Sequence, residues 1–257
     1  MPILFHETIF GPVHSRRLGY SLGINLMPVN SKICSFNCVY CECGWNPEAN
    51  FDAVLSKHEA IIHDLEKRLI EIKEKNEPLD VLTFAGNGEP TMHPKFLEIV
   101  EDVVELRNKY CPGIKIAVLT NSTMLWNPRV TIALKKIDLP ILKLDSAIES
   151  TFWVLNNPNS TFKFEKHIAY IKKFKHNHII QTMFLRGVVN NVIIDNTTHT
   201  EIDELIKVLK ELEPKKVMIY SLDRQPPANN LIKINADELE SIAVRMREND
   251  LNVQVSS

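Results

Sequence analysis

The sequence lacks a long hydrophobic run. None of its apolar stretches is long enough to cross a bilayer, and its beginning has no apolar segment of the kind that a secretion signal needs. These absences predict a cytoplasmic protein with no membrane partner. In a reducing cytoplasm, clustered cysteines are more often metal ligands than disulfides.

The sequence also lacks a basic surplus, since 30 Lys and Arg face 32 Asp and Glu, for a net charge of -2. Proteins that bind nucleic acid usually carry an excess of basic residues, so the balance argues mildly against a tRNA or DNA substrate. No low-complexity segment or internal repeat is evident. A hydrophobic content of 44% with 24% charged residues is typical of an ordinary globular enzyme.

Cysteine is scarce as well, but three of the five cysteines lie within eight residues, at Cys34, Cys38 and Cys41. Three thiolates can hold three irons of a cubane iron–sulfur cluster and leave the fourth iron without a protein ligand. Such an open iron can bind a small molecule, as the open position of a catalytic zinc does. A ferredoxin-type electron carrier would require a fourth cysteine ligand.

Two other roles remain open for the three cysteines. They can hold a structural zinc together with Cys43 or a histidine, although zinc knuckles usually bring a second C-x2-C pair and none exists here. They can also form a disulfide, which the expected compartment disfavours. Cys43 is then a bystander, a fourth ligand or a reactive thiol, and Cys111 is expected to be a buried thiol.

After the loop that carries Cys34, Cys38 and Cys41, here called the cysteine loop, strands and helices alternate. Apolar periodicity predicts helices at 53–75, 95–109, 128–136, 162–175, 199–212 and 236–249. It predicts strands at 22–26, 80–85, 114–119, 141–144, 179–185 and 216–220. This order is typical of an α/β fold with a parallel sheet and right-handed crossovers. Six units are too few for a closed eight-fold barrel, so we expect a partial (β/α)6 TIM-like barrel in a single domain, 1–257, with a core of about 17–250.

Polar residues follow the predicted strands at the edge where parallel sheets bind ligands. Gly86 and Gly88 allow close backbone approach, and Glu89 follows them. The alternative for Glu89 is a carboxylate in the first turn of the next helix. Lys143 and Asp145 alternate within an apolar strand and so face the same side, where burial predicts that they pair with each other or with a ligand.

The spacing C-x3-C-x2-C, with Tyr40 just before the last cysteine, resembles the signature of the radical SAM superfamily, and Gly86-Asn87-Gly88-Glu89-Pro90 resembles its GGEP motif. The resemblance implies a metal-binding, oxidoreductase-type enzyme with a [4Fe-4S] cluster on Cys34, Cys38 and Cys41 and S-adenosylmethionine (SAM) on the open iron. An electron from the cluster then cleaves SAM to a 5'-deoxyadenosyl radical, which abstracts hydrogen from a substrate. The residues expected to bind SAM are Tyr40, Gly86, Asn87, Gly88, Glu89, Asn121, Asp145, Ser146, Arg186 and Tyr220. Two alternatives stay open, since Asn121 can instead cap the next helix and Arg186 can instead form a surface ion pair.

The order of motifs from residue 11 to residue 227 looks like the subgroup related to wyosine-tRNA synthases, but the second cysteine set of the archaeal members is missing. The resemblance also implies an external reductant protein, a flavodoxin or a ferredoxin. A small molecule, a peptide or tRNA remains open as the substrate, and the alternative to an enzyme is a non-catalytic iron–sulfur or zinc binding module. We further expect a Glu89→Ala variant to keep its cluster and to bind SAM more weakly.

Overall fold

A computed structural model describes residues 3–47 and 54–256 of the 257-residue chain. The chain divides into two compact units, which are described separately. The N-terminal unit comprises Leu4–Cys34 and Asn46–Pro140, and the C-terminal unit comprises Met1–Ile3, Ser35–Trp45 and Ile141–Ser257. The predicted single domain stays a prediction.

The N-terminal unit is built on three parallel strands with an antiparallel strand at the edge. Its strands are β1 (Ile9–Ser15), β2 (Gly19–Ile24), β3 (Val81–Phe84) and β4 (Lys115–Thr120). β2 pairs with β3 and β3 with β4 in parallel, whereas β1 and β2 form an antiparallel hairpin. All four residues of β3 are buried, as expected for a parallel strand that is covered on both faces.

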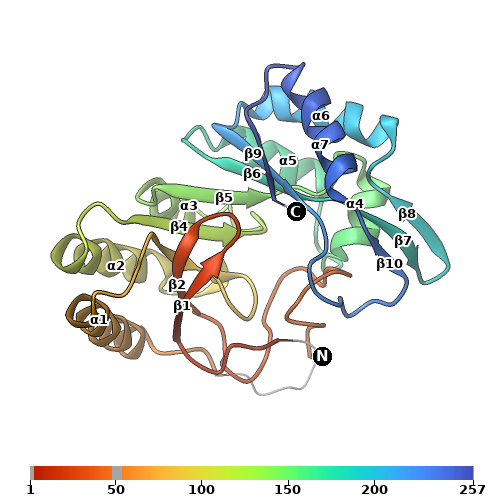
Figure 1. Cartoon of the computed structure of the whole chain (residues 1–257). Helices are drawn as coiled ribbons and strands as arrows, with labels where there is room; N and C mark the ends of the chain where they lie inside the picture. The colour runs from red at the N-terminus through yellow and green to blue at the C-terminus, as the bar shows by residue number, and fades with distance from the viewer. Residues whose placement is uncertain (1–2, 48–53, 257) are drawn as a thin grey trace. The chain divides into compact units, whose positions relative to one another are not determined.

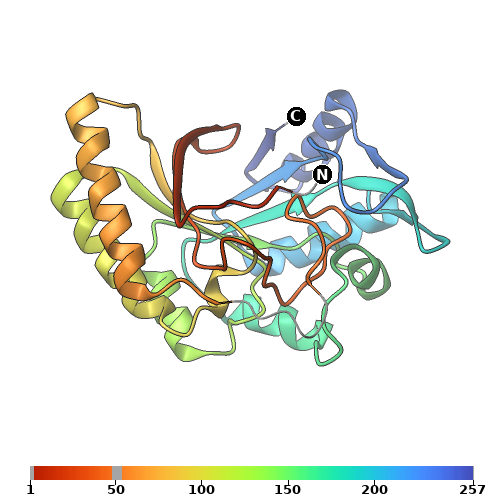
Figure 2. The same cartoon turned by 90° about the horizontal axis from the view of Figure 1, so that it is seen from below.

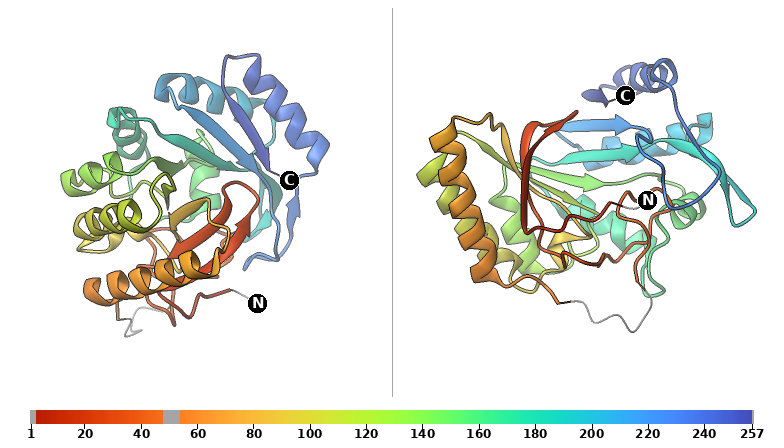
Figure 3. Two further views of the ribbon diagram at one scale, coloured as in Figure 1. Left: turned by 60° about the vertical axis from the view of Figure 1, so that its left-hand side comes forward. Right: turned by 60° about the horizontal axis from the view of Figure 1, so that its bottom comes forward.

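Three helices lie side by side in the same unit (Figure 1). They are α1 (His58–Lys75), α2 (Phe96–Tyr110) and α3 (Pro128–Lys135), and a 3-10 turn, η1 (Pro90–Met92), precedes α2. The helices lie on one side of the unit's strands (Figure 3). The apolar face predicted for α1 is confirmed, because Ile61, Leu65, Leu69 and Ile72 are its buried residues.

The C-terminal unit continues the alternation of parallel strands and helices. Its parallel strands β5 (Leu139–Lys143), β6 (Ile179–Met183), β9 (Lys216–Tyr220) and β11 (Val253–Ser256) pair in this order. Its helices are α4 (Glu149–Asn156), α5 (Phe164–Lys173), α6 (His199–Leu212) and α7 (Ala236–Arg247). The predicted alternation is therefore confirmed, while α4 and β11 were not predicted.

A second, small sheet lies in the C-terminal unit (Figure 2). It consists of β10 (Leu231–Lys233), β7 (Leu185–Val189) and β8 (Val192–Asp195) in antiparallel pairing. The predicted strand at 179–185 is thus wrong at its end, because β6 stops at Met183 and Leu185 starts β7. Arg186 consequently lies inside a strand of the small sheet rather than after a strand of the parallel sheet.

Candidate functional site

In the N-terminal unit, the start of the cysteine loop pairs with the Gly86–Glu89 segment through its backbone. The Ile33 amide donates to the Asn87 carbonyl oxygen at 3.0 Å, and the Glu89 amide donates to the Ile33 carbonyl oxygen at 3.0 Å. Gly88 has a φ of +138°, and a Cβ there would lie 1.8 Å from the Ile33 carbonyl oxygen. Only glycine fits this close approach, so the second glycine of the motif fixes the course of the loop just before Cys34.

Glu89 sits at the centre of a buried hydrogen-bond cluster. Its carboxylate caps η1 by accepting from the Thr91 amide at 3.1 Å, and it accepts from Thr120 Oγ1 at 2.6 Å and from the Asn121 amide at 2.7 Å. Burial raises the pKa of the Glu89 carboxyl, although these hydrogen bonds oppose the rise. The carboxylate is therefore fixed between the end of β4 and the start of η1. Part of its role is to cap η1, whereas the alternative expected from the sequence was a place in the first turn of the next helix.

The two asparagines of the N-terminal unit that were predicted to bind SAM, Asn87 and Asn121, have different neighbours. Asn87 is fully buried, and its side chain exchanges hydrogen bonds of 2.8 Å with the backbone of Phe5 and donates to the Pro28 carbonyl oxygen. Its carboxamide thus holds the backbone segments at Phe5 and Pro28 together. Asn121 Nδ2, by contrast, lies 3.5 Å from Cys34 Sγ as a donor to sulfur. Of these two asparagines, Asn121 is the one whose side chain is directed at a predicted cluster ligand, Cys34.

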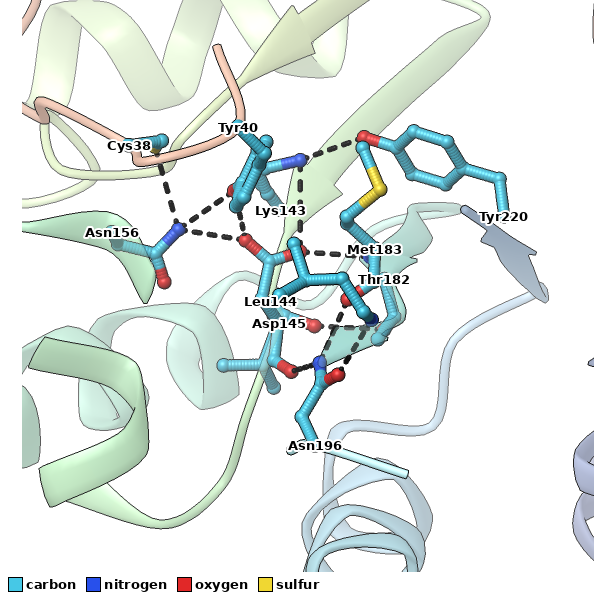
Figure 4. A network of polar contacts seen from close by, with 11 residues as sticks. Cys38, Tyr40, Lys143, Leu144, Asp145, Asn156, Thr182, Met183, Asn196 and Tyr220 are labelled. Carbon is cyan, nitrogen blue, oxygen red and sulfur yellow. Dashed lines mark hydrogen bonds and ion pairs between the residues drawn. The ribbon is translucent and has the colours of Figure 1, made fainter. Parts of the chain in front are cut away.

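In the C-terminal unit, Asp145 is the hub of a polar network (Figure 4). Lys143 Nζ lies 3.6 Å from Asp145 Oδ1 and donates to the Tyr220 hydroxyl at 2.8 Å. The Tyr40 hydroxyl donates to Asp145 Oδ2, and the Met183 amide donates to Asp145 Oδ1 at 2.8 Å. The predicted pairing of Lys143 with Asp145 is confirmed, and it brings Tyr40, Asp145 and Tyr220 together.

Asn156, the last residue of α4, links this network to the cysteine loop. Its Nδ2 donates to Asp145 Oδ2 at 2.7 Å and to the Tyr40 hydroxyl at 2.8 Å, and it lies 3.5 Å from Cys38 Sγ (Figure 4). Asn156 is not among the site residues predicted from the sequence. Its only local signal is the Asn156-Asn157-Pro158 run that ends an apolar stretch, where Asn157 adopts the left-handed conformation that stops the helix.

Burial and neighbouring charge shift the pKa values of the network. Burial raises the pKa of the Cys38 thiol, and the nearby Cys41 raises it further. Burial and the Asp145 carboxylate hold the pKa of Tyr40 well above its usual value, so its hydroxyl stays a donor. Although burial alone lowers the pKa of Lys143, the Asp145 carboxylate and Tyr220 raise it above its usual value. Lys143 is therefore a cation at neutral pH.

Two of the predicted SAM residues are engaged by other parts of the C-terminal unit. Ser146 Oγ donates to Glu201 Oε2 at 2.7 Å and accepts from the Ile148 amide at 2.9 Å. Arg186 pairs with Asp195 and Glu238 and donates to Thr197. Their place in a cofactor site stays a prediction.

The described cysteines form no disulfide. Nor do the described residues contain a ready-made group of three or more His, Cys, Asp or Glu side chains in metal-binding geometry. What the cysteine loop does show is an amide donor beside two of its sulfurs, Asn121 at Cys34 and Asn156 at Cys38. Hydrogen bonds to sulfur are a regular feature of iron–sulfur sites and tune their potentials.

Buried polar atoms without a hydrogen-bond partner lie close to these residues. In the C-terminal unit they include Asn156 Oδ1 and Gln181 Nε2, and Gln181 is paired in register with Lys143. In the N-terminal unit they include Asn25 Nδ2 and Ser122 Oγ. Each such group costs about 1–3 kcal/mol when it is left unpaired. A ligand with several donors and acceptors, as SAM has, fits this donor set.

The sequence profile described as the radical SAM superfamily matches residues 31–209. The chain belongs to the radical SAM superfamily. This match includes the three clustered cysteines and the strand ends from Gly86 to Asp145. The superfamily uses a [4Fe-4S] cluster and SAM, and its members generally catalyse radical reactions.

Two sequence relatives match most of the chain. It is 30% identical over 236 residues to the UPF0026 protein of Helicobacter pylori (strain ATCC 700392 / 26695), which covers 90% of this chain and 71% of that protein. It is 29% identical over 241 residues to a Brachyspira hyodysenteriae protein named GTPase Obg, covering 91% of this chain and 32% of that protein. The chain therefore spans about a third of the latter protein.

Solved structures show the same fold. A radical SAM methyltransferase from Sphaerobacter thermophilus matches with a TM-score of 0.68 and 14% identity, over 91% of this chain and 65% of that one. TYW1 with a lysine-pyruvate adduct bound matches with a TM-score of 0.64 and 15% identity, over 91% of this chain and 75% of that one. The predicted α/β fold with a partial (β/α)6 barrel is thereby confirmed. In the described part of the chain, every helix is too short or too polar to span a membrane.

Proposed function

We propose that the chain is a radical SAM enzyme in which Cys34, Cys38 and Cys41 hold three irons of a [4Fe-4S] cluster. The observation that carries the proposal is the pair of buried amide donors, Asn121 and Asn156, at the sulfurs of Cys34 and Cys38. When bound, the cluster supplies the electron that cleaves SAM, and the resulting 5'-deoxyadenosyl radical takes a hydrogen atom from the substrate.

The chain's own residues bind and orient the cofactor. In the N-terminal unit, the backbone of Gly86, Asn87 and Gly88 and the carboxylate of Glu89 are proposed to bind the SAM amino group. A carboxylate that faces an ammonium contributes about 1.5–3 kcal/mol. Burial of Glu89 excludes water from this contact and strengthens it.

In the C-terminal unit, the Asp145 network is proposed to hold the ribose and the adenine of SAM. Asn156 Oδ1 and Gln181 Nε2 supply a vacant acceptor and a vacant donor for hydroxyl groups. The Lys143 cation lies 3.6 Å from Asp145 and holds that side chain in place through the ion pair. The rings of Tyr40 and Tyr220 lie beside Lys143 Nζ, at 4.9 and 5.3 Å from their centroids, and are proposed to contact the adenine.

An external reductant protein, a flavodoxin or a ferredoxin, is proposed to deliver the electron, and the cytoplasm is the proposed compartment. The substrate class stays open among a small molecule, a peptide and tRNA. Because the proposed reaction begins with electron transfer to SAM, the proposed activity is described as that of an oxidoreductase without a named substrate.

A wyosine-type reaction on tRNA is the second candidate function. The motif order and the fold shared with TYW1 support common ancestry, and at 15% identity that likeness concerns the fold. The sequence has no second cysteine set, since its two other cysteines are Cys43 and Cys111. The general proposal of a radical SAM enzyme with an unassigned substrate is therefore preferred.

Cysteine replacements test the proposal. After anaerobic reconstitution, Cys38→Ala is expected to lose the brown colour, most of its iron and all reductive SAM cleavage, and Cys34→Ala and Cys41→Ala to do the same. Cys111→Ala, in the turn after α2, is the control and is expected to retain iron and SAM cleavage. Full iron loading and SAM cleavage by Cys38→Ala would contradict the assignment, and zinc without iron in the unaltered chain would favour a binding module.

A further inference from the structure

A pocket of about 410 Å³ lies beside the cysteine loop in the C-terminal unit. It is lined by the loop, the end of α4, the β7–β8 turn and the segment before β10, and none of its lining side chains in the described chain is charged. Its volume is that of pockets which bind small molecules. Lys143 and Asp145 do not line it, so it is distinct from the polar network.

Two tryptophans give the pocket its aromatic walls. Trp153 is held in place by its indole N–H, which donates to Glu149 Oε1 at 3.2 Å, and by an edge contact with the Phe162 ring at 5.8 Å. Trp45 is 44% exposed, which leaves a large apolar surface open to a ligand. The held ring of Trp153 and the exposed ring of Trp45 suit a planar ligand, since aromatic stacking contributes strongly to the binding of flat groups.

Asparagine carboxamides supply the polar part of the lining. Asn157, Asn190 and Asn230 have φ values of 38°, 48° and 62°, in the left-handed region that turns require. Glycine meets that requirement equally well, but asparagine adds a donor and an acceptor to the pocket. Carboxamides pair well with the hydrogen-bonding edge of an uncharged ring.

One residue that lines the pocket, Val39, lies in the sequence between the proposed cluster ligands Cys38 and Cys41. Val39, which lines it, follows Cys38, and its amide donates to the Leu155 carbonyl oxygen at 3.0 Å. Its carbonyl oxygen accepts from the Ala228 amide at 3.2 Å. A ligand in the pocket therefore lies against Val39, whose backbone is held on both sides by these hydrogen bonds.

We infer that this Trp45–Trp153 pocket binds an uncharged heteroaromatic ring of the substrate. The inference deepens the proposed function and rests on it only in calling the ligand a substrate. A nucleoside and an indole-type side chain share this chemistry, and the experiment distinguishes them.

The test is anaerobic calorimetric titration of the reconstituted full chain, saturated with SAM, with adenosine, guanosine, cytidine, uridine and N-acetyltryptophanamide. The variants are Trp45→Leu, Trp153→Leu and Asn190→Gly. Trp126→Leu is the matched control, because Trp126 is 56% exposed and lies outside the pocket. Melting temperatures accompany each titration.

At least one probe is expected to bind, and each tryptophan variant is expected to bind it roughly fivefold to a hundredfold more weakly. Asn190→Gly is expected to weaken binding without lowering the melting temperature, while Trp126→Leu matches the unaltered chain. Binding of nucleosides alone assigns the ring to a nucleoside, and binding of the amide alone assigns it to a peptide side chain.

Three results would overturn the inference: no probe binds, the tryptophan variants bind as the unaltered chain does, or SAM competes the probe away. If the chain does not bind SAM, the proposed function fails while the same titration without SAM still decides the pocket. The two failures are therefore distinguishable.

Discussion

At the residue scale, the side chain of Asn156, at the end of the short helix α4, contacts both the polar network and the cysteine loop. Its Nδ2 donates to Asp145 and Tyr40 and approaches Cys38 Sγ, while its buried Oδ1 has no partner. A buried acceptor without a partner is costly in a folded protein. Under the proposed function, a hydroxyl group of SAM would donate to this oxygen, while Nδ2 of the same side chain lies 3.5 Å from Cys38 Sγ.

Glu89 gives a direct test at the residue scale. Glu89→Ala would leave the donors of Thr91, Thr120 and Asn121 without an acceptor. Glu89→Gln is therefore the more specific test of the charge. It keeps an acceptor and removes the charge. We expect it to retain the cluster and to bind SAM roughly tenfold to a hundredfold more weakly, as measured by anaerobic equilibrium dialysis.

Glu59→Gln, an exposed change at the start of α1, is the control and is expected to bind SAM as the unaltered chain does. Unchanged SAM affinity in Glu89→Gln would show that the carboxylate acts only as the cap of η1.

His167 ties stability to pH. It is buried on α5 against the rings of Phe36, Phe152 and Phe162, and burial lowers its pKa from 6.5 to about 3. Between these values the unfolded chain binds a proton that the folded chain does not, so the free energy of unfolding falls as the pH decreases from about 6.5 to about 3.

His167→Phe keeps a ring in place and removes this titration. Between pH 7 and pH 5, the unaltered chain should lose about 2 kcal/mol more stability than the variant in urea unfolding. His6→Gln, at an exposed position, should keep the pH dependence of the unaltered chain. An equal loss in His167→Phe and the unaltered chain would refute the buried-histidine explanation.

At the scale of elements, the contact between the cysteine loop and the segment after β3 depends on Gly88. A Cβ at Gly88 would collide with the Ile33 carbonyl oxygen, whereas one at Gly113, which also has a positive φ, would meet nothing within 4 Å. Gly113→Ala therefore measures the backbone strain alone, which is about 1 kcal/mol.

We expect Gly113→Ala to lower the melting temperature by a few degrees and Gly88→Ala to lower it by about twice as much or more. Gly88→Ala should also incorporate less iron, because the loop before Cys34 is displaced. Equal effects of the two substitutions on both melting temperature and iron content would rule out the close approach at Ile33.

The elements that local pattern alone determines could be predicted from the sequence. The buried face of α1 and the pairing of Lys143 with Asp145 follow from periods of 3.6 and 2, which neighbours along the chain already reveal. Arg186 was placed after a parallel strand, but it lies in β7, whose partners β8 and β10 come from later in the chain. Asn156 was missed because the eight-residue α4 is too short to show a clear period.

At the scale of the whole molecule, each unit contributes the same kind of feature. In the N-terminal unit, Asn121 is directed at Cys34 Sγ and Ser122 Oγ lacks a partner. In the C-terminal unit, Asn156 is directed at Cys38 Sγ and Gln181 Nε2 lacks a partner. Each unit thus combines a donor to sulfur, a feature that tunes iron–sulfur clusters, with a buried polar group that has no partner.

The protein is proposed to hold an iron–sulfur cluster on three cysteines, with one iron open to SAM. Anaerobic electron paramagnetic resonance of the reconstituted, dithionite-reduced chain, with and without SAM, tests it most directly. We predict the signal of a reduced [4Fe-4S] cluster that changes when SAM is added. A cluster signal that is indifferent to SAM, or a chain that takes up zinc and no cluster, would contradict the claim.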